Sequence, residues 1–230
     1  MKHDRILLIT SALQFALFIP FAWWARKHKQ PPVEISLSRL VQRKQRSPVH
    51  SVVLVVNTLT GSSVLLNVLV APVAVILWMR RLRLEAIVTL VSCWTNVLVR
   101  TLIKQVVHRP RPRSPFVRST KQSKGQSFPS GHVVSAVNLW GWLFALGLLV
   151  KQNRLPGRRT LMALAALSVG FTGPARVYLG DHWTTDVLGG YLFGGGWLDL
   201  TLYSYLRLRE RGILTSPQEQ MRRDLLSSHW

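Results

Sequence analysis

The chain has 230 residues, 48% of them apolar, and carries 30 Lys and Arg against 9 Asp and Glu, for a formal net charge of +21. Its apolar residues come in blocks long enough to cross a bilayer, where a helix needs about 20 mostly apolar residues, so we set aside a soluble protein. Most basic residues lie between these blocks, where anionic lipid headgroups favour them, and not in the stripe typical of a nucleic-acid-binding surface. We therefore expect membrane lipids as partners and no nucleic acid.

Six candidate membrane spans follow one another along the chain, at 6–25, 61–79, 84–106, 132–150, 160–180 and 185–206. They predict an all-α fold, a six-span transmembrane helical bundle that forms a single domain over 1–230. The first apolar run follows Lys2 and Arg5 but has no small-residue cleavage site, so we interpret it as a retained span and not as a signal peptide. The segment 26–60 is a mixed linker in which an amphipathic helix can lie in the membrane interface, and 207–230 is a basic C-terminal tail.

An even number of spans places both termini on one side of the membrane and brings the loops 107–128 and 174–186 together on the other side. The basic residues divide almost evenly between the two sides, but tight basic pairs flank spans two to six and favour cytoplasmic termini. We therefore predict a multi-pass plasma (inner) membrane protein whose active site lies on the extracytoplasmic face.

The first polar cluster is KQVVHRPRP at 104–112, at the end of the third span. Pro110 and Pro112 predict that the helix ends here, with Lys104 and Arg111 both near its C-terminal end. Two fixed cations suit an anion, because Arg offers a planar fork to phosphate oxygens and Lys a compact point charge. The alternative is that these basic residues only anchor a helix in the interface.

The second cluster is PSGH at 129–132, directly before the fourth span. It places the Ser130 hydroxyl and the Gly131 backbone N–H at a helix N-terminus, which favours anions. The alternative is that Ser130 is a helix N-cap and nothing more. A protonated His132 in the first helical turn is disfavoured by the helix dipole, so a bound anion would compensate it.

The third cluster is RVYLGDHWTTD at 176–186. His182 and Asp186 are one helical turn apart, so the carboxylate can accept from one imidazole nitrogen while the other nitrogen faces a substrate. Arg176 adds a third cation. A lone pair of this kind is usually structural, but the three clusters together indicate one phosphate pocket with two histidines.

Metal binding is the main competing interpretation, because His and Asp also ligate zinc. Three cations in the same pocket, Lys104, Arg111 and Arg176, would repel a metal ion, and carboxylates are few. The single cysteine, Cys93, lies inside an apolar block and leaves no Cys-based zinc site. We therefore expect no metal and no cofactor.

Read in order as K-x6-RP, PSGH and R-x5-H-x3-D, the three clusters resemble the type 2 phosphatidic acid phosphatase superfamily. Its membrane members are lipid phosphate phosphatases, and its soluble relatives include bacterial acid phosphatases and vanadium haloperoxidases. The resemblance implies that His182 attacks phosphorus to form a phosphohistidine, that Asp186 orients it, and that His132 protonates the leaving group. It further implies a set of groups that bind phosphate oxygens: Lys104, Arg111, Ser130, Gly131 and Arg176.

The chain departs from the usual family pattern at Ala175, where a Ser commonly precedes the Arg of the third motif. Losing one hydroxyl donor would weaken phosphate binding by about 1–2 kcal/mol unless it is replaced. Arg109 and Arg113 can compensate, although we expect them to meet lipid headgroups instead.

The substrate implied by the resemblance is a lipid phosphate or diphosphate. Undecaprenyl diphosphate is the first expectation, because a second phosphate would engage the added arginines, and phosphatidic acid and phosphatidylglycerol phosphate follow it. The alternatives are a lipid phosphotransferase that uses the same site and a catalytically inactive membrane interaction protein. The oligomeric state is not indicated by the sequence.

Overall fold

The structure is a computed structural model that describes residues 2–43, 50–51, 53, 63–113, 115, 117–119, 125–150 and 155–214. Over these ranges it contains helices and no strand, which confirms the all-α prediction. The helices are α1 (Lys2–Lys27), α2 (Pro32–Gln42), α4 (Ser63–Met79), α5 (Arg83–Val107), α6 (Gly131–Ala136), the π-helix η1 (Val137–Gly141), α7 (Trp142–Leu149), α8 (Arg158–Tyr178) and α9 (Thr184–Glu210). Each predicted span coincides with a helix, and the fourth coincides with the continuous run α6–η1–α7.

Within the part of the chain that the structure describes, four helical segments are long and apolar enough to cross a membrane: Asp4–Lys27, Arg83–Val107, Gly131–Leu149 and Arg158–Tyr178. They make the chain a membrane protein. The apolar part of α4, Leu66–Met79, is shorter. Helix α9 has 27 residues but includes charged side chains, one of which, Asp199, accepts hydrogen bonds from Thr10 and Gln14 of α1 at 2.6 and 2.8 Å. A charge within a helical bundle in a membrane requires such partners.

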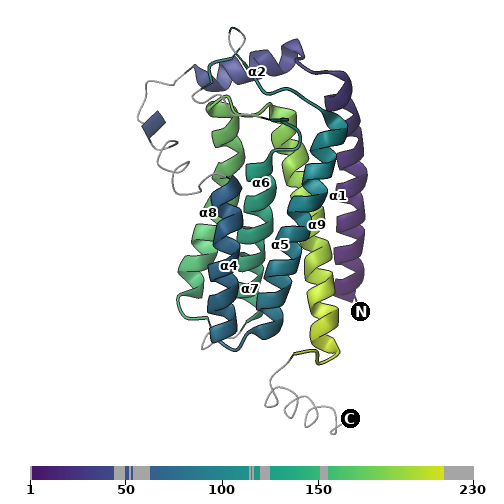
Figure 1. Ribbon diagram of the computed structural model, residues 1–230, viewed down its shortest axis with the longest axis vertical. Coiled ribbons are helices and arrows are strands. Elements are labelled where there is room, and N and C mark those ends of the chain that lie inside the picture. Colours follow the sequence, from purple (N-terminus) through teal and green to yellow (C-terminus); the bar gives the residue numbers. More distant parts are fainter. Residues whose placement is uncertain are drawn as a thin grey trace.

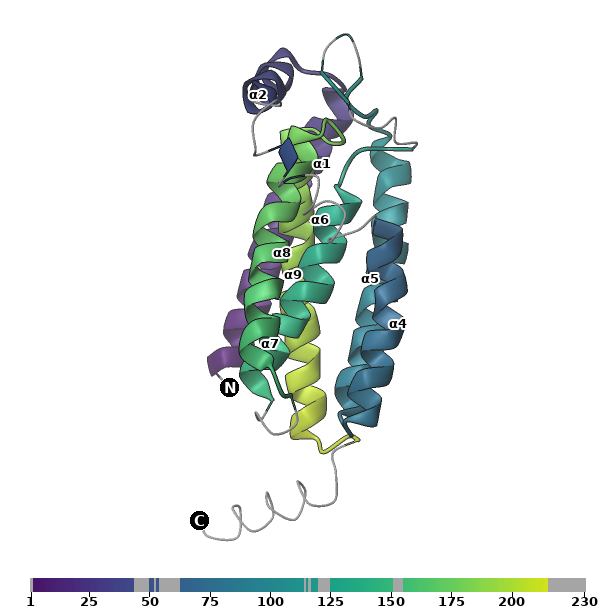
Figure 2. The ribbon, with the colours of Figure 1, turned by 90° about the vertical axis from the view of Figure 1, so that its left-hand side faces the viewer.

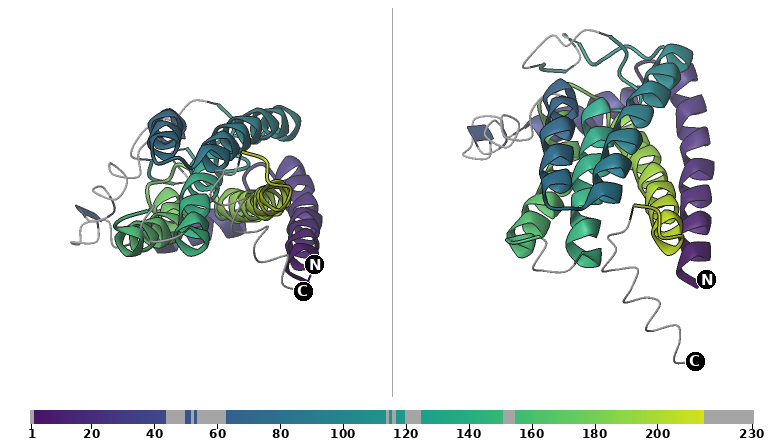
Figure 3. Two further views of the ribbon diagram at one scale, coloured as in Figure 1. Left: turned by 90° about the horizontal axis from the view of Figure 1, so that it is seen from below. Right: turned by 60° about the horizontal axis from the view of Figure 1, so that its bottom comes forward.

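The long helices stand side by side, and α2 lies across one end of the bundle (Figure 1). Helix α1 runs along α9, α4 lies beside α5, and the run α6–α7 stands between α5 and α8 (Figures 1 and 2). Figure 3 shows the same grouping from below. The first turn of α1 and the last turn of α9 lie at the end away from α2, where Arg207 Nη2 is 3.4 Å from Asp4 Oδ2.

Helices α1 and α9 approach each other closely because α9 carries three glycines in a row. A Cβ at Gly195 would overlap the Gln14 amide oxygen, and one at Gly196 would lie 3.2 Å from the Phe15 ring. The Ser11 hydroxyl donates to the Gly196 carbonyl oxygen at 2.8 Å. Small residues at such interfaces let membrane helices pack backbone to backbone, which fixes the position of α9 against α1.

Helix α2 turns an unusual face toward the bundle. Its buried residues are polar, Glu34, Ser38 and Gln42, and their spacing of four places them on one side of the helix. Its exposed side chains include Arg39 and four large apolar ones: Val33, Leu37, Leu40 and Val41. Within the segment 26–60, α2 is therefore an amphipathic helix, and its position in a membrane interface stays a prediction. Residues 44–49, 52 and 54–62 lie outside the described residues. The polar face of α2 covers the end of the bundle at which the three sequence motifs meet.

Candidate active site

The structure brings all eight predicted site residues to the α2 end of the bundle. They come from four places: the last turn of α5 and the segment after it (Lys104, Arg111), the start of α6 (Ser130, Gly131, His132), the last turn of α8 (Arg176), and the turn into α9 (His182, Asp186). The two loops predicted to meet, 107–128 and 174–186, thus contribute to one site in their described parts. The backbone N–H of Ser130 donates to the Asp186 carbonyl oxygen at 2.9 Å and joins the second and third motifs directly.

His182 and Asp186 form the buried centre of this site, and both side chains are 0% exposed. The His182 Nδ1 atom lies 3.5 Å from Asp186 Oδ2, which also accepts the Trp183 backbone N–H at 2.9 Å. Arg111 Nη1 lies 3.1 Å from His182 Nε2. Because a guanidinium group can only donate, Nε2 accepts, and the imidazole proton is assigned to Nδ1, facing Asp186. This tautomer places the Nε2 lone pair on the side of Arg111, from which it accepts when no substrate is bound.

The electrostatic surroundings keep His182 uncharged. Burial lowers the pKa of His182 well below its ordinary value of 6.5, and the positive charges of Arg111, Lys104 and Arg176 lower it further. The imidazole is therefore neutral at neutral pH and carries an available lone pair. That is the protonation state required of a nucleophile or a base.

The second histidine faces the first. The ring centroids of His132 and His182 are 6.0 Å apart and the ring planes are inclined by 74°. Within the described residues, His132 Nδ1 is buried and has no hydrogen-bond partner. The two imidazoles, from the first turn of α6 and from the turn before α9, therefore flank one small space.

Several buried donors around this space lack a partner among the described residues: Ser130 Oγ, Arg111 Nε, and Arg176 Nε and Nη2. The Ser130 side chain makes no capping hydrogen bond to α6, so a pure N-cap role does not account for it. A buried donor without a partner costs about 1–3 kcal/mol, and each such group needs an explanation. Phosphate oxygens are acceptors of the kind that these donors require.

Lys104 connects the first motif to the second. Its Nζ atom donates to the backbone carbonyl oxygens of Gln126, at 2.8 Å, and Ser127, at 3.4 Å. Ser127 in turn donates from its backbone N–H to the Arg109 carbonyl oxygen at 2.8 Å. The segment leading into PSGH is thus fixed against the end of α5.

Arg109 does not lie where the sequence suggested. It is 0% exposed, so the expectation that it meets lipid headgroups is wrong, whereas Arg113 is exposed. Arg109 Nη1 donates to Asp186 Oδ1 at 2.8 Å, and Nη2 is paired with Glu34. The cause is local: His108 adopts a left-handed conformation (φ 50°) at the end of α5 and redirects the chain beneath α2. Two carboxylates there neutralise the buried guanidinium.

A sequence model of the PAP2 superfamily matches residues 84–210, more than half of the chain. The chain belongs to the PAP2 superfamily. All three motifs and helices α5 to α9, except the first residue of α5, fall within the matched residues. The family match therefore covers the site described above.

Two curated relatives match over part of their length. The chain is 29% identical over 137 residues to phosphatidylglycerophosphatase B of Bacillus subtilis, which covers 58% of this chain and 64% of the relative. It is 32% identical over 133 residues to lipid phosphate phosphatase delta of Arabidopsis thaliana, which covers 53% of this chain and 32% of the relative. The matches thus span less than two thirds of either relative.

A solved structure shares the fold. The crystal structure of a transmembrane PAP2 type phosphatidylglycerolphosphate phosphatase from Bacillus subtilis superposes with a TM-score of 0.66, covering 84% of this chain and 94% of that one. The two sequences are 24% identical over the superposition. The helical architecture of this PAP2 chain is therefore one that a solved membrane protein also adopts.

Three residues near the PAP2 motifs were not predicted as part of the site. Arg100 is buried in α5 and donates to the Gly131 carbonyl oxygen at 2.7 Å and to Ser135 Oγ at 2.8 Å. Asp181 accepts from Arg176 through its carboxylate, at 3.2 Å, and from Arg111 through its carbonyl oxygen, at 2.9 Å. Glu34 pairs with Arg109. Only Arg100 had a sequence signal, as a charge inside an apolar span.

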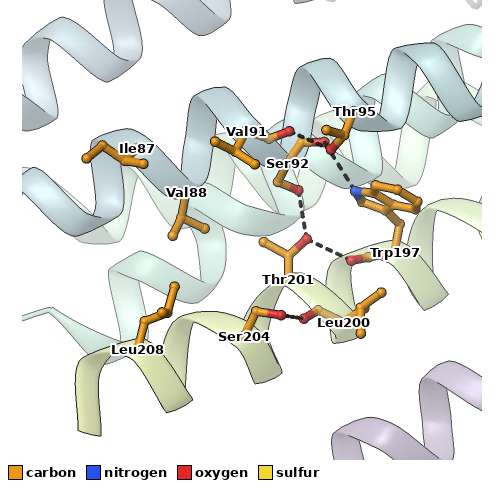
Figure 4. A pocket seen from close by; sticks show the side chains of 10 residues that line it. All are labelled: Ile87, Val88, Val91, Ser92, Thr95, Trp197, Leu200, Thr201, Ser204 and Leu208. Atoms are coloured by element: carbon orange, nitrogen blue, oxygen red, sulfur yellow. Dashed lines mark hydrogen bonds between the residues drawn. The ribbon is translucent and has the colours of Figure 1, made fainter. Parts of the chain in front are cut away.

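Two hollows lined by described residues lie outside the PAP2 site. One, of about 410 Å³, is lined by Arg39, Gln42, Arg43, Pro115 and Arg118, so three guanidinium groups give the rim beside α2 a positive potential. The other, of about 240 Å³, is a groove between α5 and α9 (Figure 4). Its hydroxyl groups bond within the groove walls, for example Ser92 to Thr201 at 2.7 Å, so it offers a hydrocarbon-like surface.

Proposed function

We propose that this PAP2 chain hydrolyses a phosphate ester of a membrane lipid through a phosphohistidine on His182. The observation that carries the proposal is the position of His182 Nε2, which faces Arg111 at 3.1 Å while Nδ1 faces Asp186 and the His132 ring stands opposite. A nucleophile held by a carboxylate on one side and an acid on the other is the arrangement that phosphoryl transfer through an enzyme intermediate requires.

In the first step, His182 Nε2 attacks phosphorus, the P–N bond forms and the P–O bond to the lipid breaks. His132, which carries a proton while the phosphate anion is bound, donates that proton to the departing oxygen, which prevents release of a high-energy alkoxide or phosphate anion. Asp186 stabilises the positive charge that the imidazole of His182 acquires. The buried donors of Arg111, Ser130 and Arg176, with Lys104 and the Gly131 N–H, bind the nonbridging oxygens.

In the second step, water attacks the phosphorus of the phosphohistidine. His132, now neutral, removes a proton from the water, the P–N bond breaks, and inorganic phosphate leaves. His132 is then protonated again and His182 is neutral, so both groups return to their starting states.

We propose that the reaction uses no metal ion. The two histidines are surrounded by Lys104, Arg111 and Arg176, and these fixed positive charges supply the transition-state stabilisation that a divalent cation provides elsewhere. The carboxylates nearest to the histidines are already engaged: Asp186 with Arg109 and Asp181 with Arg176.

The substrate proposal changes with the position of Arg109. Undecaprenyl diphosphate was favoured because a second phosphate would engage Arg109 and Arg113, but Arg109 is buried and paired with two carboxylates. The B. subtilis relative is named for phosphatidylglycerophosphate, so phosphatidylglycerol phosphate becomes the first substrate to assay. Phosphatidic acid and undecaprenyl diphosphate remain the comparison substrates.

We further propose a plasma-membrane protein with six spans, cytoplasmic termini and an extracytoplasmic site. The start of α1 and the end of α9 lie at the end of the bundle opposite α2, which supports this placement (Figure 1). The single native cysteine, Cys93, is buried and should not react with a maleimide. The labelling of an added cysteine can therefore be measured without replacing Cys93. Arg113→Cys should react with a membrane-impermeant maleimide in intact cells, and Arg209→Cys only after permeabilisation. The reverse pattern would invert the proposed orientation.

The test of the activity is phosphate release from the three lipids by detergent-purified protein in the presence of EDTA. We expect release by the native chain, none by His182→Ala, and native rates for His108→Asn, a matched change at an exposed histidine next to the site. An acid-labile phosphoryl group should be trapped on the native chain and not on His182→Ala. Phosphate release abolished by EDTA and restored by a divalent metal would contradict the metal-free mechanism.

A transferase is distinguished in the same assay. Adding glycerol at increasing concentration should leave the main product as inorganic phosphate. A phosphorylated alcohol as the main product would replace the hydrolase proposal with phosphoryl transfer. An absence of either product from folded protein would favour a binding role.

A further inference from the structure

We propose that Glu34, on α2, is a positioning residue for the PAP2 site. Through Arg109 and the first turn of α9 it holds Asp186 in the orientation that His182 requires. The inference rests on the proposed function and assigns a role to a residue outside the three motifs. It also gives α2 a role in the reaction beyond contact with the membrane.

The first support is the set of contacts around the Glu34 carboxylate, which is 1% exposed. Oε1 accepts from the backbone N–H of Thr185 at 2.8 Å and from its hydroxyl at 2.6 Å, and Oε2 accepts from Arg109 Nη2. The Thr185 hydroxyl in turn accepts from Arg109 Nη1 at 2.6 Å. Glu34, Thr185 and Arg109 therefore form a closed ring of charge-assisted hydrogen bonds.

The second support is the line of charges that leads from this ring to the nucleophile. Arg109 uses Nη1 for Asp186 Oδ1, at 2.8 Å, and Nη2 for Glu34, so its single positive charge is shared between two carboxylates. Asp186 uses its other oxygen, Oδ2, toward His182 Nδ1. Without Glu34, Arg109 would be balanced by Asp186 alone and would compete with His182 for that carboxylate.

The third support is the way in which the segment around α2 joins two helix ends. Glu34 accepts one of the free N–H groups in the first turn of α9, the turn that carries Asp186. Just before α2, Lys29 Nζ donates to the Val107 and His108 carbonyl oxygens, at 2.9 and 3.0 Å, at the end of α5. The segment therefore links the C-terminal end of α5, which precedes Arg109, to the first turn of α9, which carries Asp186.

The test compares Glu34→Gln with Glu85→Gln. The Gln at 34 can still accept from Thr185, but its NH2 group cannot accept from Arg109. The change therefore removes the interaction with Arg109 and keeps the one with Thr185. Glu85 is a matched control, because it is also a buried carboxylate but bonds Tyr205 through Oε1, at 2.8 Å, toward the other end of the bundle. We expect kcat on the lipid phosphate to fall about 10- to 100-fold in Glu34→Gln, with KM little changed, and native kcat in Glu85→Gln.

A double-mutant cycle tests whether Glu34 acts through Arg109. In an Arg109→Gln background, Glu34→Gln should change kcat less than about twofold, because the charge that Glu34 balances is already gone. The double variant removes the negative charge of Glu34 and the positive charge of Arg109 together, so the net charge of the buried cluster does not change. The comparison therefore remains informative if Glu34→Gln alone folds poorly. Full additivity of the two changes would overturn the proposal, and so would native kcat in Glu34→Gln.

A readout without catalysis separates this inference from the proposed function. Amide hydrogen exchange at 184–187 should be faster in Glu34→Ala than in the native chain and unchanged in Glu85→Ala. Unchanged exchange in Glu34→Ala would contradict the proposed anchoring of α9. If the native chain released no phosphate from any lipid, the hydrolase proposal would fail while the exchange experiment still judged the role of Glu34.

Discussion

The imidazole rings of His132 and His182 stand nearly at right angles, with their centroids 6.0 Å apart, across the space toward which the buried donors of the site converge. Phosphoryl transfer needs each reacting atom about 3–3.5 Å from its partner, and two imidazoles this close can both serve one phosphoryl group. In the proposed mechanism the two histidines have separable roles: His182 forms the bond to phosphorus and His132 donates the proton to the leaving group.

This separation predicts a dependence on the leaving group. His132→Ala should lose about 100- to 10,000-fold in kcat on a lipid phosphate, because an alkoxide leaves poorly without a proton. The same variant should still release a first equivalent of p-nitrophenol from p-nitrophenyl phosphate at nearly the native rate, because that leaving group needs no proton, and then turn over slowly, because His132 also activates water in the second step. His182→Ala should be inactive on both, because no phosphohistidine can form. Equal losses in the rate of the first step on the two substrates, measured in a single turnover, would argue against a general acid at this position.

The pH dependence of kcat/KM should report the neutral state of His182. The reactive form is unprotonated, so activity falls as pH drops through the pKa of His182 in the free enzyme. Burial and the neighbouring cations lower that pKa, so the acid limb should lie below pH 6.5. Arg111→Gln removes one of these cations and should move the limb upward, whatever it does to the rate. An acid limb above pH 6.5 in the native chain would contradict this account of the site.

Ala175 offers a change that should raise activity. Its side chain is 4% exposed and directly precedes Arg176, so a hydroxyl added there is placed next to a phosphate-binding guanidinium. If Ala175→Ser restores one hydrogen bond to phosphate, about 1–2 kcal/mol of binding returns and kcat/KM rises about 5- to 30-fold. Ala165→Ser, a buried change on the same helix α8, controls for the general cost of adding a hydroxyl and should not raise kcat/KM.

The sequence predicted the fold well because membrane-spanning helices can be recognised from their length and apolar composition. The predicted span 84–106 differs from α5, Arg83–Val107, by one residue at each end, and 160–180 differs from α8, Arg158–Tyr178, by two. The π-helix η1 inside the fourth span was not foreseen, because no residue pattern distinguishes it from an α-helix. The π-bonded turn depends on packing against neighbouring helices, which hydropathy does not report.

The site residues that belong to the three spaced motifs were predicted, and the site residues outside these motifs were missed. Arg109 lies two residues before Arg111, and this spacing alone does not indicate that Arg109 contacts Asp186 while Arg111 contacts His182. That outcome depends on the left-handed turn at His108 and on Glu34, a residue far away in sequence. A lone acid in a basic linker carries no periodic or motif signal, so only the three-dimensional arrangement identifies its partner.

Gly180 should be required for the shape of the third motif, and a second glycine provides the control. Gly180 has φ +71°, and a Cβ there would overlap the Arg118 carbonyl oxygen, while Gly157 has φ +72° with no atom near its Cβ position. Both Gly→Ala changes carry the cost of a left-handed Ala, about 1–2 kcal/mol. Only Gly180→Ala also displaces the segment that Gln42 Nε2 holds through the Arg118 and Tyr178 carbonyl oxygens, at 2.7 and 3.1 Å.

Gly180→Ala should therefore lower the unfolding temperature more than Gly157→Ala and should also reduce kcat, because Asp181 and His182 follow directly in the chain. Gly157→Ala should leave kcat at the native value, since that turn precedes α8 at the end of the bundle away from α2. Thermal unfolding in detergent and phosphate release measured on the same preparations check both expectations. Equal unfolding temperatures and equal kcat for the two variants would mean that only the backbone conformation, and not the contact with Arg118, requires glycine at 180.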